Sequence, residues 1–307
     1  MKISVNCFWL QKAGNTPDEY EDAFDLSYNR RGRSRLQPTP GCLTFEREVR
    51  HPVFAIADGA SDGAYPAMWA RSLVRSCVRQ GPRTSRSLRR LVEGLGESQL
   101  ERLAAEPLPW WSAQKVRLGD FAALLSLSLG ANPQGGPSGG LWTALAVGDA
   151  CLFQIRQDEL AARFPIESAD EIGYNPVLLC TVATKNQRVW EQAGRLRRTG
   201  EWLPGDRFFL MTDALAHWFL TLVESGAQPW HTLTELAKSP QTVLQLPLMP
   251  EQPPERRRPK RPHACQSLID RFGGWVGQSR SSGALRNDDV TLLMITAGED
   301  HESATIR

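Results

Sequence analysis

The chain has 307 residues, of which 41% are hydrophobic and 23% charged, and its formal net charge is +2. These values are ordinary for a globular protein with a buried core, and the near-neutral charge points to no particular class of partner. No apolar run approaches the roughly 18 residues of a membrane helix. We therefore expect no membrane association and predict a cytoplasmic protein.

Cysteine and histidine spacing excludes two kinds of site. The six cysteines contain no CxxC pair, and no two of the five histidines stand at metal-ligand spacing. This pattern favours a reducing compartment over a disulfide framework or a zinc site. Residues 1–15 predict a first strand and not a signal peptide, because Asn6 interrupts the apolar run and no small-residue cleavage site follows.

A pair of carboxylates stands at the entrance to the second predicted strand. Glu21 and Asp22 precede Phe24 and Leu26, which alternate with polar residues as in a strand with one buried face. Residues 29–41 are rich in arginine, proline and glycine, and their composition predicts a loop.

A buried strand over 53–57 ends at another carboxylate. Asp58 and Gly59 follow where the apolar run would otherwise continue, and such a pair taken alone is most often a turn. The segment 43–47 is expected to pair with residues 52–57. Pro66 then suits the first turn of a helix.

Two helices are predicted next, over 66–80 and 85–105, from apolar residues that recur with helical spacing. No acidic residue lies between Gly63 and Val92. The arginines of this stretch are Arg71, Arg75, Arg79, Arg83, Arg86, Arg89 and Arg90. The solvated face of a helix pair is the simpler interpretation of this run, and a docking surface is the alternative.

The middle of the chain reads as strands with short connections. Apolar runs over 121–130 and 141–149 are followed by a predicted hairpin over 151–164, with its turn at 157–158. Consecutive strands without intervening helices predict an antiparallel sheet. Residues 166–200 carry no clear pattern.

The pattern of residues 53–80, in which a buried strand ends at a carboxylate and a helix follows, returns near residue 207. A buried strand over 207–211 ends just before Asp213, and a helix is predicted over 215–223. The segment 245–263 is rich in proline and arginine and too polar to fold on its own, so we predict a mobile surface insert there.

The last predicted elements are a helix over 265–279 and a strand preceded by Asp288 and Asp289. Acidic residues thus lie at the rims of several buried strands, where their repulsion requires a counter-charge. Magnesium and manganese ions prefer such oxygen ligands. Two such ions about 3.5–4 Å apart can clamp a phosphoryl group.

The motifs ED-AF, ADG, GD, TDA and DDVT occur in this order across residues 3–296. They resemble those of the metal-dependent serine/threonine protein phosphatases of the type 2C family, and the final helix and strand look like those of bacterial members. The resemblance implies an α+β fold, a four-layer α-β-β-α sandwich of two antiparallel sheets flanked by helices, with residues 1–307 as a single domain. In the GD motif, Asp149 matches an aspartate that is mainly structural.

The resemblance also implies two manganese or magnesium ions held by six residues. These are Glu21, Asp22, Asp58, Gly59, Asp213 and Asp288. Asp58 matches the aspartate that bridges both ions, and Asp213 and Asp288 match ligands of the first ion. The 21–22 pair matches the acidic pair of the second ion. The implied reaction is hydrolysis of phosphoserine and phosphothreonine in proteins, such as a kinase or its targets, by water that the ions activate.

Several positions depart from the family pattern. Pro17 stands where the family usually places a phosphate-binding arginine, and Lys12 or an arginine of the 30–35 loop is the candidate replacement. Ala60 stands where some members carry a histidine that acts as general acid. Asp120 lies near the position of a third-metal aspartate, but it fits a turn residue as well as a ligand.

Two other functions remain in consideration. The departures at positions 17 and 60 suggest a phosphatase-like protein that has lost turnover and binds a phosphoprotein or a partner kinase. Retention of the three catalytic aspartates favours the enzyme, because a binding module has no physical need for them. The arginines of 83–90 and 256–261 also suggest a nucleic-acid surface. The lack of interleaved aromatic residues counts against that reading, so no nucleic-acid partner is expected.

Overall fold

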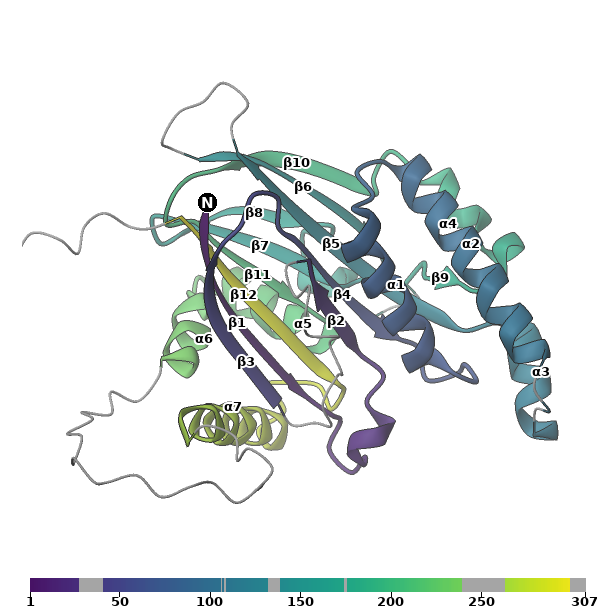
Figure 1. Ribbon diagram of the computed structural model, residues 1–307. Helices are drawn as coiled ribbons and strands as arrows, with labels where there is room; N and C mark the ends of the chain where they lie inside the picture. Colours follow the sequence, from purple (N-terminus) through teal and green to yellow (C-terminus); the bar gives the residue numbers. More distant parts are fainter. Residues whose placement is uncertain are drawn as a thin grey trace, which may run out of the picture.

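The computed structural model describes residues 1–27, 41–105, 107, 109–131, 139–173, 176–238 and 263–298. Two antiparallel sheets pack face to face, and helices cover the outer face of each (Figure 1). The predicted four-layer α-β-β-α sandwich is therefore confirmed. Apart from residue 263, the predicted insert at 245–263 lies outside the described residues.

One sheet has the strand order β3-β1-β12-β11-β7-β8 in the described part of the chain. Its strands are β3 (Gly41–Glu48), β1 (Lys2–Leu10), β12 (Val290–Ala297), β11 (Arg207–Met211), β7 (Cys151–Arg156) and β8 (Glu159–Phe164). Two strands far apart in sequence are neighbours inside this sheet, because Leu10 of β1 pairs with Val290 of β12. This pairing brings the segment after β1 close to the aspartates that precede β12.

The second sheet has the order β10-β6-β5-β4-β2, and β9 pairs with β5 beside that path. Its strands are β10 (Arg197–Trp202), β6 (Gly140–Val147), β5 (Phe121–Ala131), β4 (Val53–Gly59), β2 (Ala23–Leu26) and β9 (Leu179–Cys180). The chain passes from β6 in this sheet to β7 in the other through Gly148, whose φ of 89° suits glycine. The consecutive strands are thus antiparallel as predicted, but they are shared between two sheets.

The expected pairing of segment 43–47 with residues 52–57 is wrong. The first segment belongs to β3, which pairs with β1 at the edge of the other sheet. Most β3 side chains are exposed, whereas β4 is largely buried between β2 and β5. A strand with so few buried side chains suits an edge position better than a place beside a buried central strand.

The helices divide between the two outer faces (Figure 1). The α-helices are α1 (Pro66–Gln80), α2 (Ser85–Ala104), α3 (Trp110–Leu118), α4 (Gln187–Glu191), α5 (Asp213–Glu224), α6 (Pro229–Ala237) and α7 (His263–Ser281). The short 3-10 helices are η1 (Pro17–Glu19), η2 (Ala169–Glu171) and η3 (Ala183–Asn186). The sequence did not predict α3, where two tryptophans were taken to break the pattern, or α4, which lies in the segment without a clear pattern.

Apolar side chains fill the spaces between the layers. Trp142 of β6 and Phe208 of β11 are fully buried between the sheets, with ring centroids 6.3 Å apart. Trp69 of α1 is buried against the second sheet. On the opposite side Phe219 of α5 stacks on Phe153 of β7, with centroids 4.1 Å apart. These contacts fix the layers relative to one another.

Two further features concern the described residues alone. None of their helices is both long enough and apolar enough to cross a bilayer. Among the described residues, Cys7, Cys77, Cys151 and Cys180 are free thiols.

Helix α2 touches the loop after β9 at a glycine, which gives a test of the packing. A Cβ atom built on Gly96 would lie 2.2 Å from the carbonyl oxygen of Thr181. We therefore expect Gly96→Ala to lower the free energy of unfolding by about 1–3 kcal/mol. A Cβ on Gly94 of the same helix meets nothing within 4 Å, so Gly94→Ala is expected to raise it by up to about 1 kcal/mol. Urea denaturation measures both, and a stabilised Gly96→Ala variant would contradict the described packing.

Candidate active site

Carboxylates from both sheets converge at one end of the sandwich. Asp58 lies near the end of β4, and its pKa is raised well above the usual value, first by burial. The charges of Asp22, Asp213, Asp149 and Asp288 raise the pKa of Asp58 further. The three aspartates to which the resemblance assigns catalysis therefore lie within electrostatic reach of one another, although they come from distant parts of the sequence.

Asp22 is the fully buried member of this carboxylate cluster, with none of its surface exposed to solvent. Its Oδ2 atom accepts hydrogen bonds from the hydroxyls of Thr212, at 2.9 Å, and Thr291, at 2.7 Å. Its buried Oδ1 atom has no partner among the described residues. Burial raises the pKa of Asp22 well above its usual value, and the charges of Asp289 and Asp213 add to this. Asp22 is thus held firmly while one of its oxygens stays available.

Asp289 connects the elements around the cluster, a role that sequence reasoning missed. Its Oδ1 atom accepts the backbone N–H of Lys12 at 2.7 Å, and its Oδ2 atom accepts the backbone N–H of Glu21 at 2.6 Å. The segments that follow β1 and precede β2 are thereby fixed to the start of β12. The acidic pair at 288–289 was visible in the sequence, but nothing in it separated a connecting residue from a ligand.

Asp213 and Asp288 are hydrogen-bonded locally. Asp213 is the first residue of α5, and its Oδ1 atom accepts the N–H of Ala214 at 2.5 Å. Burial and the charges of Asp149 and Asp288 raise the pKa of Asp213 to about 7. The Oδ1 atom of Asp288 accepts the N–H of Asp289 at 3.0 Å and lies 3.7 Å from the ammonium nitrogen of Lys12.

Glu21 and Gly59 meet across β2 and β4. The carboxylate of Glu21 accepts a hydrogen bond from the hydroxyl of Ser61, and burial raises the pKa of Glu21. A Cβ on Gly59 would lie 2.9 Å from the carbonyl group of Pro66 and 3.0 Å from the carbonyl oxygen of Glu21. Only glycine fits this position without a shift of the backbone.

A second residue that sequence reasoning missed is Arg286, in the loop before β12. Its Nη1 atom donates to the carbonyl oxygen of Ile172 at 3.3 Å, and the guanidinium covers Gly173 so closely that a Cβ there would lie 2.4 Å from Nη1. The N–H of Gly173 and the charge of Arg286 both oppose the rise that burial causes in the pKa of Asp149. The charge of Arg286 also acts on Asp213 in that direction. Arg286 is therefore a cation beside the carboxylate cluster, although no sequence motif marks it.

Asp120 fixes a loop. Its Oδ1 atom accepts the N–H of Tyr65 at 2.7 Å, and its Oδ2 atom accepts from the side chain of Gln99 at 3.2 Å. These bonds join the loop after β4 to α2. They give Asp120 the structural role that was one of its two interpretations.

The carboxylate cluster does not form a closed coordination shell. Among the described residues no three His, Cys, Asp or Glu side chains are grouped closely enough to hold a metal ion. Like charges repel, and two of the carboxylates instead accept N–H groups of their own backbone neighbours. The donor set nevertheless fits a hard divalent cation, because it consists of oxygen atoms only. It includes the Oδ1 atom of Asp22, which has no partner among the described residues. It also contains carboxyls, such as Asp22 and Asp58, whose pKa values are raised by burial and then by neighbouring charges.

Comparison with known proteins supports the fold and goes no further. No protein-family model matches the sequence, and no curated protein does. The catalytic domain of the serine/threonine phosphatase PstP, solved with two manganese ions, aligns over 97% of this chain and 100% of its own, with 13% identity and a TM-score of 0.50. The Mycobacterium tuberculosis phosphatase PstP/Ppp gives the same values. This chain therefore has the fold of the bacterial serine/threonine phosphatases of the type 2C family, which confirms the resemblance seen in its motifs.

Proposed function

We propose that this chain is a metal-dependent protein phosphatase that hydrolyses phosphoserine and phosphothreonine. The observation that carries the proposal is the cluster of carboxylates at the ends of strands from both sheets, in which the charges of four other aspartates act on Asp58. Such an arrangement costs free energy in the folded chain unless cations offset the repulsion. The fold supports the proposal, since a structure of the same fold was solved with two manganese ions.

Two manganese or magnesium ions would be held by the six residues named from the resemblance. When bound, such ions neutralise charge on a phosphoryl group and lower the pKa of water enough to make it a nucleophile at neutral pH. The chain contributes the positioning. Two threonine hydroxyls hold Asp22, and Asp289 holds the backbone of Lys12 and Glu21. Gly59 lets β4 approach the carbonyl group of Glu21.

The phosphate of the substrate requires cations besides the metal ions, because it must approach several carboxylates. Lys12 is the candidate from the sequence, and its ammonium group lies beside Asp288. Arg286 is the stronger candidate, because its guanidinium has one hydrogen-bond partner among the described residues, the carbonyl oxygen of Ile172. A guanidinium also presents paired donors that match two phosphate oxygens. We assign phosphate binding first to Arg286 and second to Lys12.

The alternative is a phosphatase-like protein that binds a phosphoprotein or a partner kinase without turnover. Pro17 and Ala60, which stand where the family usually places a phosphate-binding arginine and some members a histidine, favour this alternative. The mutually repelling carboxylates favour the enzyme, because a binding module gains nothing from their repulsion.

Hydrolysis of p-nitrophenyl phosphate and of a phosphothreonine peptide, with and without manganese, tests the proposal. We expect turnover of both substrates with manganese and none after chelation. Binding of the phosphopeptide without turnover at any manganese concentration would instead establish the alternative.

A further inference from the structure

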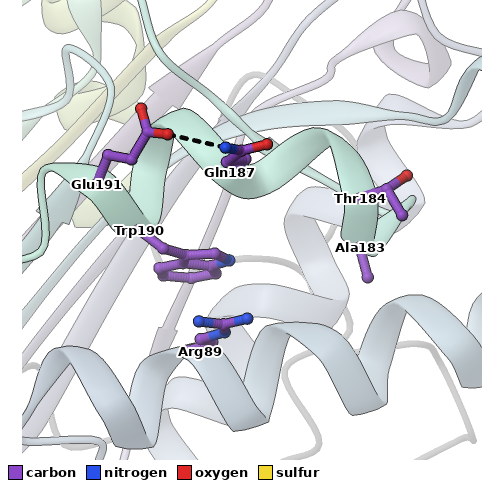
Figure 2. A pocket seen from close by; sticks show the side chains of 6 residues that line it. All are labelled: Arg89, Ala183, Thr184, Gln187, Trp190 and Glu191. Carbon is purple, nitrogen blue, oxygen red and sulfur yellow. Dashed lines mark hydrogen bonds between the residues drawn. The ribbon is translucent and has the colours of Figure 1, made fainter.

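The outer helical layer contains a recess that shares no residue with the carboxylate cluster. It has a volume of about 520 Å³ and lies between α2 and the η3–α4 segment (Figure 2). The residues that line it are Arg89, Ala183, Thr184, Gln187, Trp190 and Glu191. One member of the arginine-rich stretch, Arg89, thus lines a recess in the surface.

An arginine and a tryptophan face each other in this recess. The guanidinium carbon of Arg89 lies 5.8 Å from the centroid of the Trp190 ring, with the two side chains facing each other (Figure 2). The Nε atom of Arg89 donates to Glu93 at 2.7 Å, and the side chain is 55% exposed. Neither Nη atom of Arg89 has a partner among the described residues. The aromatic ring thus orients a guanidinium whose terminal donors remain available for an anion.

The surroundings of the recess are positively charged. Exposed arginines occupy the N-terminal half of α2, the segment just before its N-cap, and α4 across the recess. They are Arg83, Arg86, Arg89, Arg90 and Arg188. Two acidic side chains beside Arg89 and Trp190 are already engaged, since Glu93 accepts from Arg89 at 2.7 Å and Glu191 accepts from Gln187 at 3.0 Å. An anionic partner would therefore meet an excess of positive charge.

We propose that this recess docks an acidic segment of the phosphoprotein substrate. A carboxylate of the segment bonds the free Nη atoms of Arg89, and an apolar stem packs against Trp190. The term substrate rests on the proposed phosphatase activity, whereas the binding of an acidic peptide does not. A peptide fits better than nucleic acid, because the recess offers a single aromatic ring, whereas the grooves that bind single-stranded nucleic acid stack successive bases on several rings.

Fluorescence anisotropy with a labelled peptide of alternating glutamate and alanine tests the docking. The peptide carries no phosphate, so it reports on the recess and not on the candidate active site. We expect Arg89→Glu to weaken binding at least about tenfold, because a charge-assisted hydrogen bond is replaced by repulsion. The control is Arg117→Glu on α3, which removes the same charge from an exposed position outside the recess. It should change binding less than about twofold at physiological salt, where distant charges are screened.

Measurement of KM for two substrates then tests whether the docked peptide is part of the substrate. Arg89→Glu should raise KM about tenfold for a phosphothreonine peptide with an acidic extension, and it should leave KM for p-nitrophenyl phosphate unchanged. Three results would each overturn the inference. Arg89→Glu and Arg117→Glu could weaken peptide binding equally, an oligothymidine could bind more tightly than the peptide, or KM for the extended substrate could stay unchanged. If the wild-type protein binds the peptide through Arg89 but hydrolyses neither substrate, the proposed function fails while the docking site stands.

Discussion

Asp58→Asn is expected to lower manganese-dependent hydrolysis of p-nitrophenyl phosphate at least about 100-fold. Loss of a residue that only orients a metal ligand commonly costs 10–100-fold in affinity or activity, so loss of a bridging ligand should cost at least that much. Asparagine has nearly the same volume as aspartate, so the change removes charge without leaving a cavity. Wild-type turnover in this variant would exclude Asp58 from the proposed metal site.

The same substitution is expected to stabilise the protein when metal is removed by chelation. Four aspartates raise the pKa of Asp58, so its ionised form is repelled in the folded chain, and the neutral amide removes that repulsion. The stabilisation of Asp58→Asn relative to the wild type should grow as pH rises, because more of the wild-type carboxyls are then ionised. Asp213, with a pKa of about 7, keeps a proton in the folded chain that the unfolded chain has released. The free energy of unfolding of the wild type therefore falls as pH rises from about 4 to about 7.

Asp206→Asn is the matched control, because Asp206 is a buried aspartate with favourable partners. It accepts hydrogen bonds from Arg156 at 2.8 Å, from Gln154 at 2.7 Å and from the N–H of Leu203 at 2.9 Å. Its substitution is expected to lower the free energy of unfolding by about 1–3 kcal/mol. Chemical denaturation of both metal-free variants should give changes of opposite sign. A loss of stability in both would show that Asp58 is not repelled by its neighbours.

Arg286→Ala is expected to weaken inhibition by inorganic phosphate about 10–100-fold. A hydrogen bond between charged groups contributes about 1.5–3 kcal/mol, and this variant removes the guanidinium that we assign to the phosphate. KM for a phosphopeptide should rise by a similar factor, and Arg286→Lys should recover part of the loss. The inhibition constant of phosphate is the decisive measurement, because a purely structural role would change stability and leave that constant unaltered.

Lys12→Ala provides the comparison at the other candidate cation beside the carboxylate cluster. Its ammonium group already lies 3.7 Å from Asp288 and is 41% exposed, so we expect a smaller loss of phosphate affinity than at Arg286. If Lys12→Ala has the larger effect and Arg286→Ala has none, then phosphate binding belongs to Lys12, the residue that the sequence suggested first.

Local patterns predicted most of the fold. The turn after β7 illustrates why, because Gln157 and Asp158 have φ values of 48° and 64°, as a tight turn between two strands requires. The position of Asp58 was equally readable, since an apolar strand ends there at a carboxylate. In both places the residues that determine the structure are adjacent in the sequence.

The remainder depends on contacts between distant residues. The hydroxyl of Thr291 reaches Asp22 across 269 positions, and Asp289 reaches the backbone of Lys12 across 277. No local pattern shows that a threonine on one strand will hold an aspartate on another. Arg286 was missed for the same reason, because its role depends on Gly173 and Asp149, which approach it only in the folded chain.

The pairing of β1 with β12 determines when the carboxylate cluster can exist during synthesis. Of the described elements, β12 leaves the ribosome last, and until then β1 has no neighbour on the side toward β11. Asp289, which joins the segments around the cluster, and its neighbour Asp288 emerge immediately before β12. The candidate catalytic centre therefore stays incomplete until β12 has emerged, even when most of the chain is already outside the ribosome. The proposed phosphatase activity would therefore require β12 to have joined the sheet.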